Sequence, residues 1–246
     1  MTRFHLAADA VRGDQVIFDK ATAHHLGRVL RAAVGDQVQA VDAGGQLLSV
    51  RLTAIDARRA EGVVLTRARL ATESPLELTL AQAIPKGDKM DTVIRMTTEL
   101  GVSRVIPLIT ARTVVRLEPA RWGARVARWQ RVAKEAVQQC GRAAVPEVMP
   151  PRELAAWHHE ARAGGLLICF WEEERRGLAT LLPPDPGPRV TVVVGPEGGL
   201  TAAEVGALSA AGALVAGLGP RLLRTETAGA VAVALLQARY GDLGTA

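Results

Sequence analysis

The feature that most constrains the fold is an alternation, from Leu76 onward, of short apolar runs with longer segments of helical periodicity. We predict strands at the apolar runs, which cover residues 76–83, 104–109, 166–170, 190–194 and 213–218. We predict helices at residues 88–100, 120–140, 152–161, 201–211 and 226–239. Strands that are nearly all apolar and separated by helices are typical of a mostly parallel sheet with both faces covered. This part of the chain is therefore expected to be an α/β domain.

The first 72 residues follow a different pattern, in which turn signals at residues 34–36 and 43–45 separate short strand-like runs. The runs cover residues 15–18, 36–41, 46–53 and 62–66. Such spacing favours a small β-barrel-like domain. A short polar stretch at residues 72–75, which ends in a proline, is the expected boundary. We therefore predict two domains, residues 1–72 and residues 73–246.

Composition excludes several classes of protein. The chain has 246 residues, of which 48% are hydrophobic and 22% are charged, so it should bury a core rather than be disordered. The longest uncharged stretch, residues 205–220, is short of a membrane span and contains four glycines, which rules out a transmembrane helix. Its first residues lack the pattern of a secretory signal, so we expect a cytoplasmic protein. Cys140 and Cys169 are too few for a zinc site and should be free thiols, so neither a metal nor a disulfide is expected.

Two glycine-rich loops are the sharpest local signals. The first, Gly195-Pro-Glu-Gly-Gly199, follows an apolar strand and precedes a helix that a Thr201–Glu204 capping box should begin. The second, residues 217–225, also follows a strand, and Arg221 and Arg224 lie in it. In open α/β sheets ligands bind at the carboxyl ends of the strands, so the two loops should form one cleft, although tight turns without a ligand remain the alternative. Neither loop has the pattern of a dinucleotide fingerprint or a P-loop.

Charge is concentrated in one segment. Residues 112–142 contain eight basic and two acidic side chains, whereas the whole chain has a net charge of +5. Arg121, Arg125 and Arg128 follow the i, i+4, i+7 spacing of one helix face. A stripe of this kind indicates contact with nucleic-acid phosphates, and a merely solvated helix face is the alternative.

A second polar stripe is expected in the N-terminal domain at residues 24–31. On a helix, Leu26, Val29 and Leu30 would form an apolar face and His24, Arg28 and Arg31 a polar one. His24 and its neighbour His25 would point about 100 degrees apart, which excludes a shared metal site of the i, i+4 kind. We therefore predict that the polar face meets RNA.

Several of these segments together resemble one known family. They are His24-His-Leu26 to Arg31, Lys86-Gly-Asp-Lys-Met-Asp91 with Glu99-Leu-Gly101, Glu135-Ala-x-x-Gln139-Cys-Gly-Arg142 with Val145-Pro146, Gly195-Pro-Glu-Gly-Gly199, and Leu218-Gly-x-Arg-Leu-Leu-Arg-Thr-Glu-Thr-Ala228. In this order they resemble the RsmE family of bacterial 16S rRNA uridine-N3 methyltransferases. The resemblance implies a PUA-like β-barrel domain, followed by an α/β SPOUT methyltransferase domain with a deep trefoil knot. It also implies S-adenosylmethionine as cofactor, 16S rRNA or the 30S subunit as partner, and a homodimer with the apolar last helix at its interface.

The resemblance also implies site residues. The cofactor would be held by Phe170, Trp171, Gly195, Pro196, Glu197, Gly198, Gly199, Leu218, Gly219, Leu223, Arg224 and Thr225. RNA would be bound by Arg3, His24, Arg28, Arg31, Lys86, Arg121, Arg125 and Arg128. For the chemistry, Arg224 is the candidate to stabilise negative charge on the uracil, Glu226 to orient Arg224, and Glu197 a weaker candidate for proton acceptor. A ribose 2′-O methyltransferase of the same superfamily and a non-catalytic RNA-binding module are the alternatives.

Overall fold

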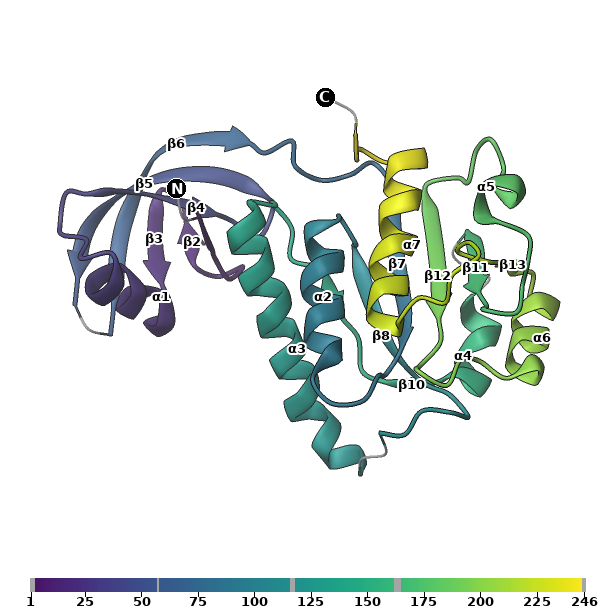
Figure 1. Ribbon diagram of the computed structural model, residues 1–246. Coiled ribbons are helices and arrows are strands. Elements are labelled where there is room, and N and C mark those ends of the chain that lie inside the picture. The colour runs from purple at the N-terminus through teal and green to yellow at the C-terminus, as the bar shows by residue number, and fades with distance from the viewer. Residues whose placement is uncertain (1–2, 57, 116–117, 162–164, 245–246) are drawn as a thin grey trace. The chain divides into compact units, whose positions relative to one another are not determined.

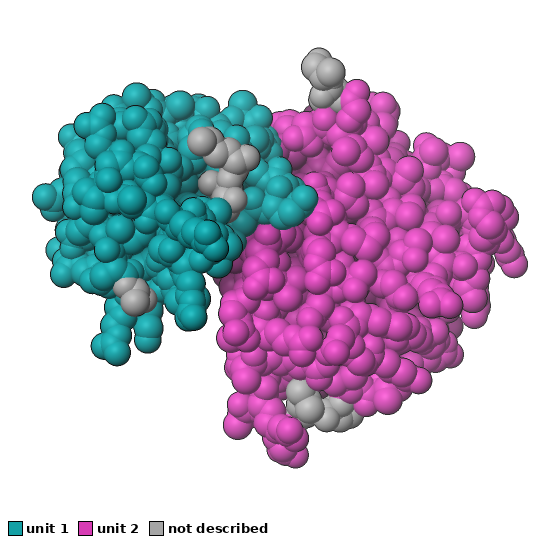
Figure 2. Space-filling view, turned by 60° about the vertical axis from the view of Figure 1, so that its left-hand side comes forward, with its two compact units in different colours: residues 1–73, 137–144 teal, residues 74–136, 145–246 magenta. Residues whose placement is uncertain are grey.

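The chain divides into two compact units in the computed structural model, which describes residues 3–56, 58–115, 118–161 and 165–244 (Figures 1 and 2). Unit 1 comprises residues 1–73 and 137–144, and unit 2 comprises residues 74–136 and 145–246. Residues 137–144, which the sequence pattern placed with the α/β part, thus belong to unit 1. No helix among the described residues has the length and apolar character that crossing a bilayer requires.

Unit 1 is built on one six-stranded sheet with the order β1-β4-β5-β6-β3-β2. The strands are β1 (Arg3–His5), β2 (Val11–Arg12), β3 (Gln15–Phe18), β4 (Gln37–Val41), β5 (Gln46–Ile55) and β6 (Ala60–Arg69). All pairs are antiparallel except β1 with β4. The four predicted strands are present, whereas β1 and β2 were not predicted because three and two residues are too short for a visible alternation.

The sheet of unit 1 is curved like a partly closed barrel. Its two edge strands, β1 and β2, are joined by only the five residues 6–10. Six chain steps span at most about 21 Å, whereas the five gaps of a flat six-stranded sheet would need about 24 Å. The sheet therefore bends around a core whose members include Phe4, Phe18, Leu26, Leu48 and Leu52.

Unit 2 contains a second sheet in which every strand pair is parallel. The order is β10-β8-β7-β12-β11-β13, with β9 pairing with β8. The strands are β7 (Glu77–Ala83), β8 (Arg104–Ile109), β9 (Glu147–Val148), β10 (Arg152–Glu153), β11 (Leu166–Phe170), β12 (Arg189–Val194) and β13 (Leu214–Ala216). The prediction of a mostly parallel sheet is confirmed. The short strands β9 and β10 were missed, and β10 occupies the start of a predicted helix.

Helices cover both faces of this sheet (Figure 1). They are α2 (Lys89–Glu99), α3 (Pro119–Cys140), α4 (Leu154–Ala161), α5 (Leu178–Leu181), α6 (Ala202–Ala210) and α7 (Thr225–Tyr240). Residues of α2, α3, α5 and α7 pack with Leu78, Leu80 and Val192 on one face. Residues of α4 and α6 pack with Ala81, Cys169 and Val193 on the other. Because side chains alternate along a strand, Val192 packs against the helices on one face of the sheet and Val193 against those on the other. Both faces are covered, which explains why the strands are apolar throughout.

Helix ends follow their predicted signals with one exception. The capping box of α6 is complete, with Thr201 accepting from the Glu204 amide and the Glu204 carboxylate accepting from the Thr201 amide. Gly101 ends α2 with a φ of 89°, which only glycine adopts readily. Asp88 occupies the N-cap position directly before α2, but its side chain makes no capping hydrogen bond.

Helix α7 is apolar on all sides in the sequence, which indicates burial in the core or against another subunit, and the single chain buries one of its faces. Its buried face includes Gly229, Ala232, Val233 and Leu236, whereas Leu235 is 46% exposed in the single chain. The opposite face of α7 is thus apolar and uncovered.

Candidate active site

A cavity of about 470 Å³ lies at the carboxyl ends of β11, β12 and β13, three strands that are neighbours in the sheet. Three loops line it, residues 170–175, 194–199 and 217–225, and Lys89 and Ala228 complete the wall. Because parallel strands end at the same edge, the topology alone brings these loops together. The prediction that the two glycine-rich loops share a cleft is therefore confirmed.

Glycines allow the loops to approach one another closely. Gly199 has a φ of 72°, and a Cβ there would overlap the Glu172 carboxylate. A Cβ on Gly217 would overlap the backbone carbonyl of Glu174, while one on Gly195 would lie 3.1 Å from the backbone of Gly199. The absence of a side chain at these glycines therefore allows the loops to pack closely against one another around the cavity.

One buried hydroxyl joins the loops of β12 and β13. Thr225, the first residue of α7, donates its Oγ1 hydrogen to the Gly195 carbonyl at 2.6 Å and accepts from Gln82 Nε2 at 2.9 Å. Gln82 is fully buried in β7, and its Nε2 also donates to the Ala83 carbonyl at 3.0 Å. This chain of hydrogen bonds sets the separation of the two loops.

A charged cluster lies at the cavity wall, where Lys89 meets two carboxylates. Lys89 Nζ is 3.0 Å from Glu197 Oε1 and 3.6 Å from Glu226 Oε2. The backbone amide of Lys86 donates to the same Glu197 oxygen at 3.0 Å. Burial acts to raise the pKa of Glu197, but hydrogen bonds from its own backbone and from Lys89 outweigh burial and lower it. The hydrogen bond to Glu197 raises the pKa of Lys89, so both groups are charged at neutral pH.

The lining combines apolar surface with charged groups of both signs, the basic ones being Lys89, Arg175, Arg221 and Arg224. Phe170, Leu218 and Leu223 supply apolar surface, and the carboxylates of Glu172 and Glu174 lie in the loop after β11. Trp171 also lines the cavity, and among the described residues its buried Nε1 has no hydrogen-bond partner. A donor of this kind is available to an acceptor on a ligand.

No thiolate is available at the site. Cys169 lies in β11 directly before the lining residue Phe170, and burial raises its pKa to about 12. The thiol is therefore neutral at physiological pH and cannot serve as a nucleophile.

Comparison with known proteins places the chain in a family. A model described as an RNA methyltransferase domain matches residues 72–237, and an RNA methyltransferase PUA domain matches residues 18–65. The ribosomal RNA small subunit methyltransferase E of Bacillus subtilis is 33% identical over 213 residues, which cover 83% of this chain and 82% of the relative. The enzyme of the same name from Synechocystis is 32% identical over 96% of this chain and 77% of its own length.

The chain belongs to the ribosomal RNA small subunit methyltransferase E family. Solved structures agree with this assignment. A putative methyltransferase from Legionella pneumophila in complex with S-adenosylmethionine superposes with a TM-score of 0.90 at 31% identity, covering 98% of this chain and 99% of the other. The Neisseria gonorrhoeae methyltransferase E bound to S-adenosylmethionine gives a TM-score of 0.89 at 33% identity with the same coverage. The predicted fold, a PUA domain with an α/β methyltransferase domain, is confirmed.

Of the residues predicted to hold the cofactor of this methyltransferase, all but one line the cavity. They are Phe170, Trp171, Gly195, Pro196, Glu197, Gly199, Leu218, Gly219, Leu223, Arg224 and Thr225. Gly198 does not line it, because its carbonyl accepts from Arg112 Nη1 at 2.7 Å on the other side of the loop. The prediction missed five charged lining residues, Lys89, Glu172, Glu174, Arg175 and Arg221. Lys89 and Arg221 lie in segments that carry the family resemblance, whereas the other three have no distinctive sequence pattern.

The predicted pairing of Arg224 with Glu226 is wrong. Glu226 faces Lys89, and within the described part of the chain the Arg224 side chain has no ion pair or hydrogen bond. Arg224 is the N-cap of α7 and Glu226 is the second residue of the helix, so their side chains leave the backbone in different directions.

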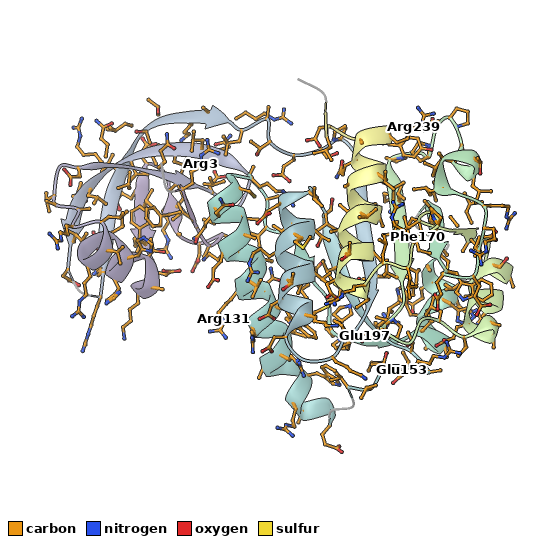
Figure 3. The ribbon with its side chains drawn as sticks, viewed as in Figure 1. Arg3, Arg131, Glu153, Phe170, Glu197 and Arg239 are labelled. Carbon is orange, nitrogen blue, oxygen red and sulfur yellow. The ribbon has the colours of Figure 1, made fainter. Side chains whose placement is uncertain are left out.

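The predicted RNA-binding stripe on α3 is less charged than its sequence indicates. Arg128 forms two hydrogen bonds to Asp91 Oδ2, at 2.7 and 3.0 Å, and Arg125 donates to the Gly87 carbonyl while lying over the Trp129 ring. Arg121 and Arg131 are exposed, and among the described residues neither side chain has a partner (Figure 3 labels Arg131). Arg116, which contributed to the predicted basic segment, lies outside the described residues.

Four RNA-binding residues were predicted in unit 1; three of them are exposed, and the fourth is hydrogen-bonded within the unit. His24, Arg28 and Arg31 are exposed on and after α1 (Lys20–His24) and the π-helical turn η1 (His25–Val29). Of the predicted apolar face only Leu26 is buried, whereas Val29 is 63% and Leu30 45% exposed. Arg3 instead donates to the Gly141 carbonyl at 2.6 Å within unit 1.

Lys86 is the last of the predicted RNA-binding residues. The Lys86 side chain is exposed beside the cavity residue Glu197, to which its backbone is bonded. Within the described ranges, no group of three or more His, Cys, Asp or Glu side chains is placed to hold a metal ion.

Proposed function

We propose that this protein transfers a methyl group from S-adenosylmethionine to N3 of a uridine in 16S ribosomal RNA. The observation that carries the proposal is the glycine-lined cavity at the carboxyl ends of β11, β12 and β13, in a chain of the methyltransferase E family. Two solved structures with this fold contain bound S-adenosylmethionine, and each aligns with nearly the whole of this chain.

The residues present fit this cofactor. A volume of about 470 Å³ lies in the range of small-molecule sites. Phe170, Leu218 and Leu223 would contact the adenine, and the backbone of residues 195–199 and 217–219 would meet polar groups of the ligand. The carboxylate of Glu172 would attract a positive group of the ligand, whereas that of Glu174 is already paired with Arg176. When bound, S-adenosylmethionine supplies an electrophilic methyl group on a sulfonium.

The chain's own groups would assist the loss of the N3 proton from the uracil. Positive charge near the base stabilises the anion that forms, and both Arg224 and Lys89 line the cavity. Glu197 is a poor proton acceptor, because its hydrogen bonds keep it ionised and lower its pKa. Alignment of N3 with the methyl carbon contributes the remaining acceleration.

Two measurements test the proposed function. Calorimetry with S-adenosylhomocysteine should detect a saturable site on the wild-type protein. Mass spectrometry of nucleosides from 16S rRNA and from 30S subunits, each incubated with protein and cofactor, should detect N3-methyluridine. Ribose methylation instead would show a 2′-O methyltransferase, and absence of cofactor binding would show an RNA-binding module without catalysis.

We also infer a homodimer in which the uncovered face of α7 packs against a second copy. Leu235 is 46% exposed there, and a helix that is apolar on this side gains by burial. Leu235→Glu should yield a monomer in sedimentation experiments, whereas Leu65→Glu, at an apolar position of unit 1 that is 38% exposed, should not. A dimeric Leu235→Glu protein would contradict the inference.

The proposed function also gives each of the two predicted domains a role. Residues 1–72 would act as an RNA-binding domain together with exposed arginines of α3, and residues 73–246 as the methyltransferase domain with the implied trefoil knot. Because small-subunit rRNA is made and modified in the bacterial cytoplasm, the protein would act there.

A further inference from the structure

Lys89 is a charged residue of the cavity wall that was not among the predicted site residues. It is the first residue of α2, and it reaches the cavity from the loop that follows β7. Glu197 belongs to the loop after β12, and Glu226 belongs to the first turn of α7. One ammonium group therefore meets carboxylates from two other elements, both of which border the cofactor cavity.

The geometry holds the ammonium in place and leaves part of it available. Glu197 Oε1 lies at 3.0 Å and Glu226 Oε2 at 3.6 Å from Nζ. These two carboxylates account for at most two of the three N–H groups of the ammonium. Since Lys89 itself lines the cavity, and no other hydrogen bond to its side chain occurs in the described ranges, at least one N–H remains for a ligand there.

The other cations of the cavity wall, Arg175, Arg221 and Arg224, are held differently. All three are exposed, and no described residue binds their guanidinium groups. A charged donor that is already fixed before the reaction stabilises a developing charge better than one that must first be ordered. Of the four cations, Lys89 thus has the arrangement that electrostatic catalysis requires.

We infer that Lys89 is a catalytic residue that donates a hydrogen bond to a carbonyl oxygen of the uracil and stabilises the negative charge that develops on it. The inference rests on the proposed function. As the N3–H bond breaks, the proton passes to solvent water and its electron pair stays on the base. N3 then forms a bond to the methyl carbon while the carbon–sulfur bond breaks and its electron pair goes to sulfur.

The test compares Lys89→Met and Lys89→Arg with wild type and with Arg189→Met, at the exposed first residue of β12. Single-turnover methylation is measured at saturating cofactor, on whichever of 16S rRNA or the 30S subunit the wild type methylates. Lys89→Met should slow methylation about 100-fold, the usual cost of one lost oxyanion donor. Lys89→Arg should retain much of the rate, and Arg189→Met all of it. Thermal unfolding and calorimetry with S-adenosylhomocysteine accompany each variant.

Two readouts separate this role from a structural one. Without Lys89 the base is harder to ionise, so the rising limb of the pH–rate profile should move to higher pH in Lys89→Met. The charged groups that face Lys89 are Glu197 and Glu226, and Arg224 shares the cavity, so the same profile is recorded for Glu197→Gln, Glu226→Gln and Arg224→Met. RNA transcribed with 5-fluorouridine triphosphate has a more acidic N3, and it should recover most of the lost rate of Lys89→Met.

Three outcomes would overturn the inference. An unshifted pH profile with no recovery on 5-fluorouridine RNA would make Lys89 structural. A loss of cofactor affinity as large as the loss of rate would assign Lys89 to cofactor binding. A shift of the profile in Arg224→Met alone would assign the electrostatic role to Arg224. A wild-type protein that forms no N3-methyluridine would refute the proposed function itself, which is a separate result.

Discussion

At the scale of single residues, backbone conformation and loop packing act together at Gly199. Its φ of 72° lies in the left-handed region, and a Cβ would meet the Glu172 carboxylate. Gly206, in the middle of α6, has neither restriction, because nothing lies within 4 Å of a Cβ there. The two glycines therefore form a matched pair for substitution.

Gly199→Ala should destabilise the fold by about 1–2 kcal/mol, the cost of an L-residue in the left-handed region, and should weaken cofactor binding. Gly206→Ala should stabilise it by up to about 1 kcal/mol through helix propensity. Urea denaturation followed by circular dichroism measures both. Equal stability of wild type and Gly199→Ala would show that the loop relaxes without strain.

Glu174 has the most displaced acidic pKa of the cavity loops. A hydrogen bond from the Arg176 side chain is the largest cause, and backbone amides add to it, so the pKa falls from 4.5 to about 2. A carboxylate with a lowered pKa stabilises the folded state above its unfolded pKa, and the contribution disappears as pH falls toward the folded value.

The stability difference between wild type and Glu174→Gln should therefore be constant above about pH 5 and shrink between 4.5 and 2. Denaturation curves recorded across this range measure the difference. Glu173→Gln serves as the neighbouring control, and its difference should stay small throughout. A Glu174→Gln difference that does not change with pH would contradict the lowered pKa.

At the scale of elements, α6 begins at a capping box that also anchors another segment. Glu204 accepts from the Thr201 amide through Oε2 and from the Ala111 amide through Oε1, each at 2.8 Å. The box therefore fixes both the helix start and the chain that follows β8. This start lies directly after the glycine-rich loop, so the cap also limits how the loop can move.

Thr201→Ala should lower the free energy of unfolding by about 1 kcal/mol, because the Glu204 amide loses its acceptor. Ser209→Ala, at an exposed position in the last turn of the same helix, should change it by no more than about 0.5 kcal/mol. Thermal or urea unfolding of the two variants gives the comparison. Similar values for both would show that water replaces the cap without loss.

At the scale of the whole molecule, arginines of similar sequence context have opposite roles. Arg142 has a side chain only 8% exposed, and its Nη2 lies 2.6 Å from Glu73 Oε2 within unit 1. The Glu73 carboxylate also accepts from the Ala143 and Ala144 amides, at 2.8 and 3.1 Å. Arg121 is exposed on α3 and free of partners among the described residues. Both contribute equally to the predicted basic segment, but only Arg121 is available to RNA.

Arg142→Ala should cost about 3 kcal/mol or more of stability, because it leaves a partly buried carboxylate without its cation. Arg121→Ala should leave stability unchanged and reduce the slope of log affinity for rRNA against log salt by about 1. Filter binding at several salt concentrations, with unfolding curves of both variants, tests this. A wild-type salt slope in Arg121→Ala would remove that residue from the RNA-binding surface.

The sequence by itself determined the elements and the location of the cavity loops. Apolar periodicity shows which faces of a strand or helix are buried, and glycines that follow strands mark where the backbone comes close to a ligand. For this reason β8 and β11 were predicted to the residue. The cofactor candidates came from the family resemblance, and eleven of the twelve line the cavity. The implied knot stays a prediction, since local patterns carry no information about threading.

The tertiary structure alone decided which charged groups meet. The order of the sheet places β12 between β7 and β11, and thereby brings Glu197 to Lys89, which is 108 positions away along the chain. Arg128 likewise pairs with Asp91 across two helices rather than remaining free for RNA. Periodicity reports that a side chain is exposed, but its partner depends on packing between distant elements, which no local pattern contains.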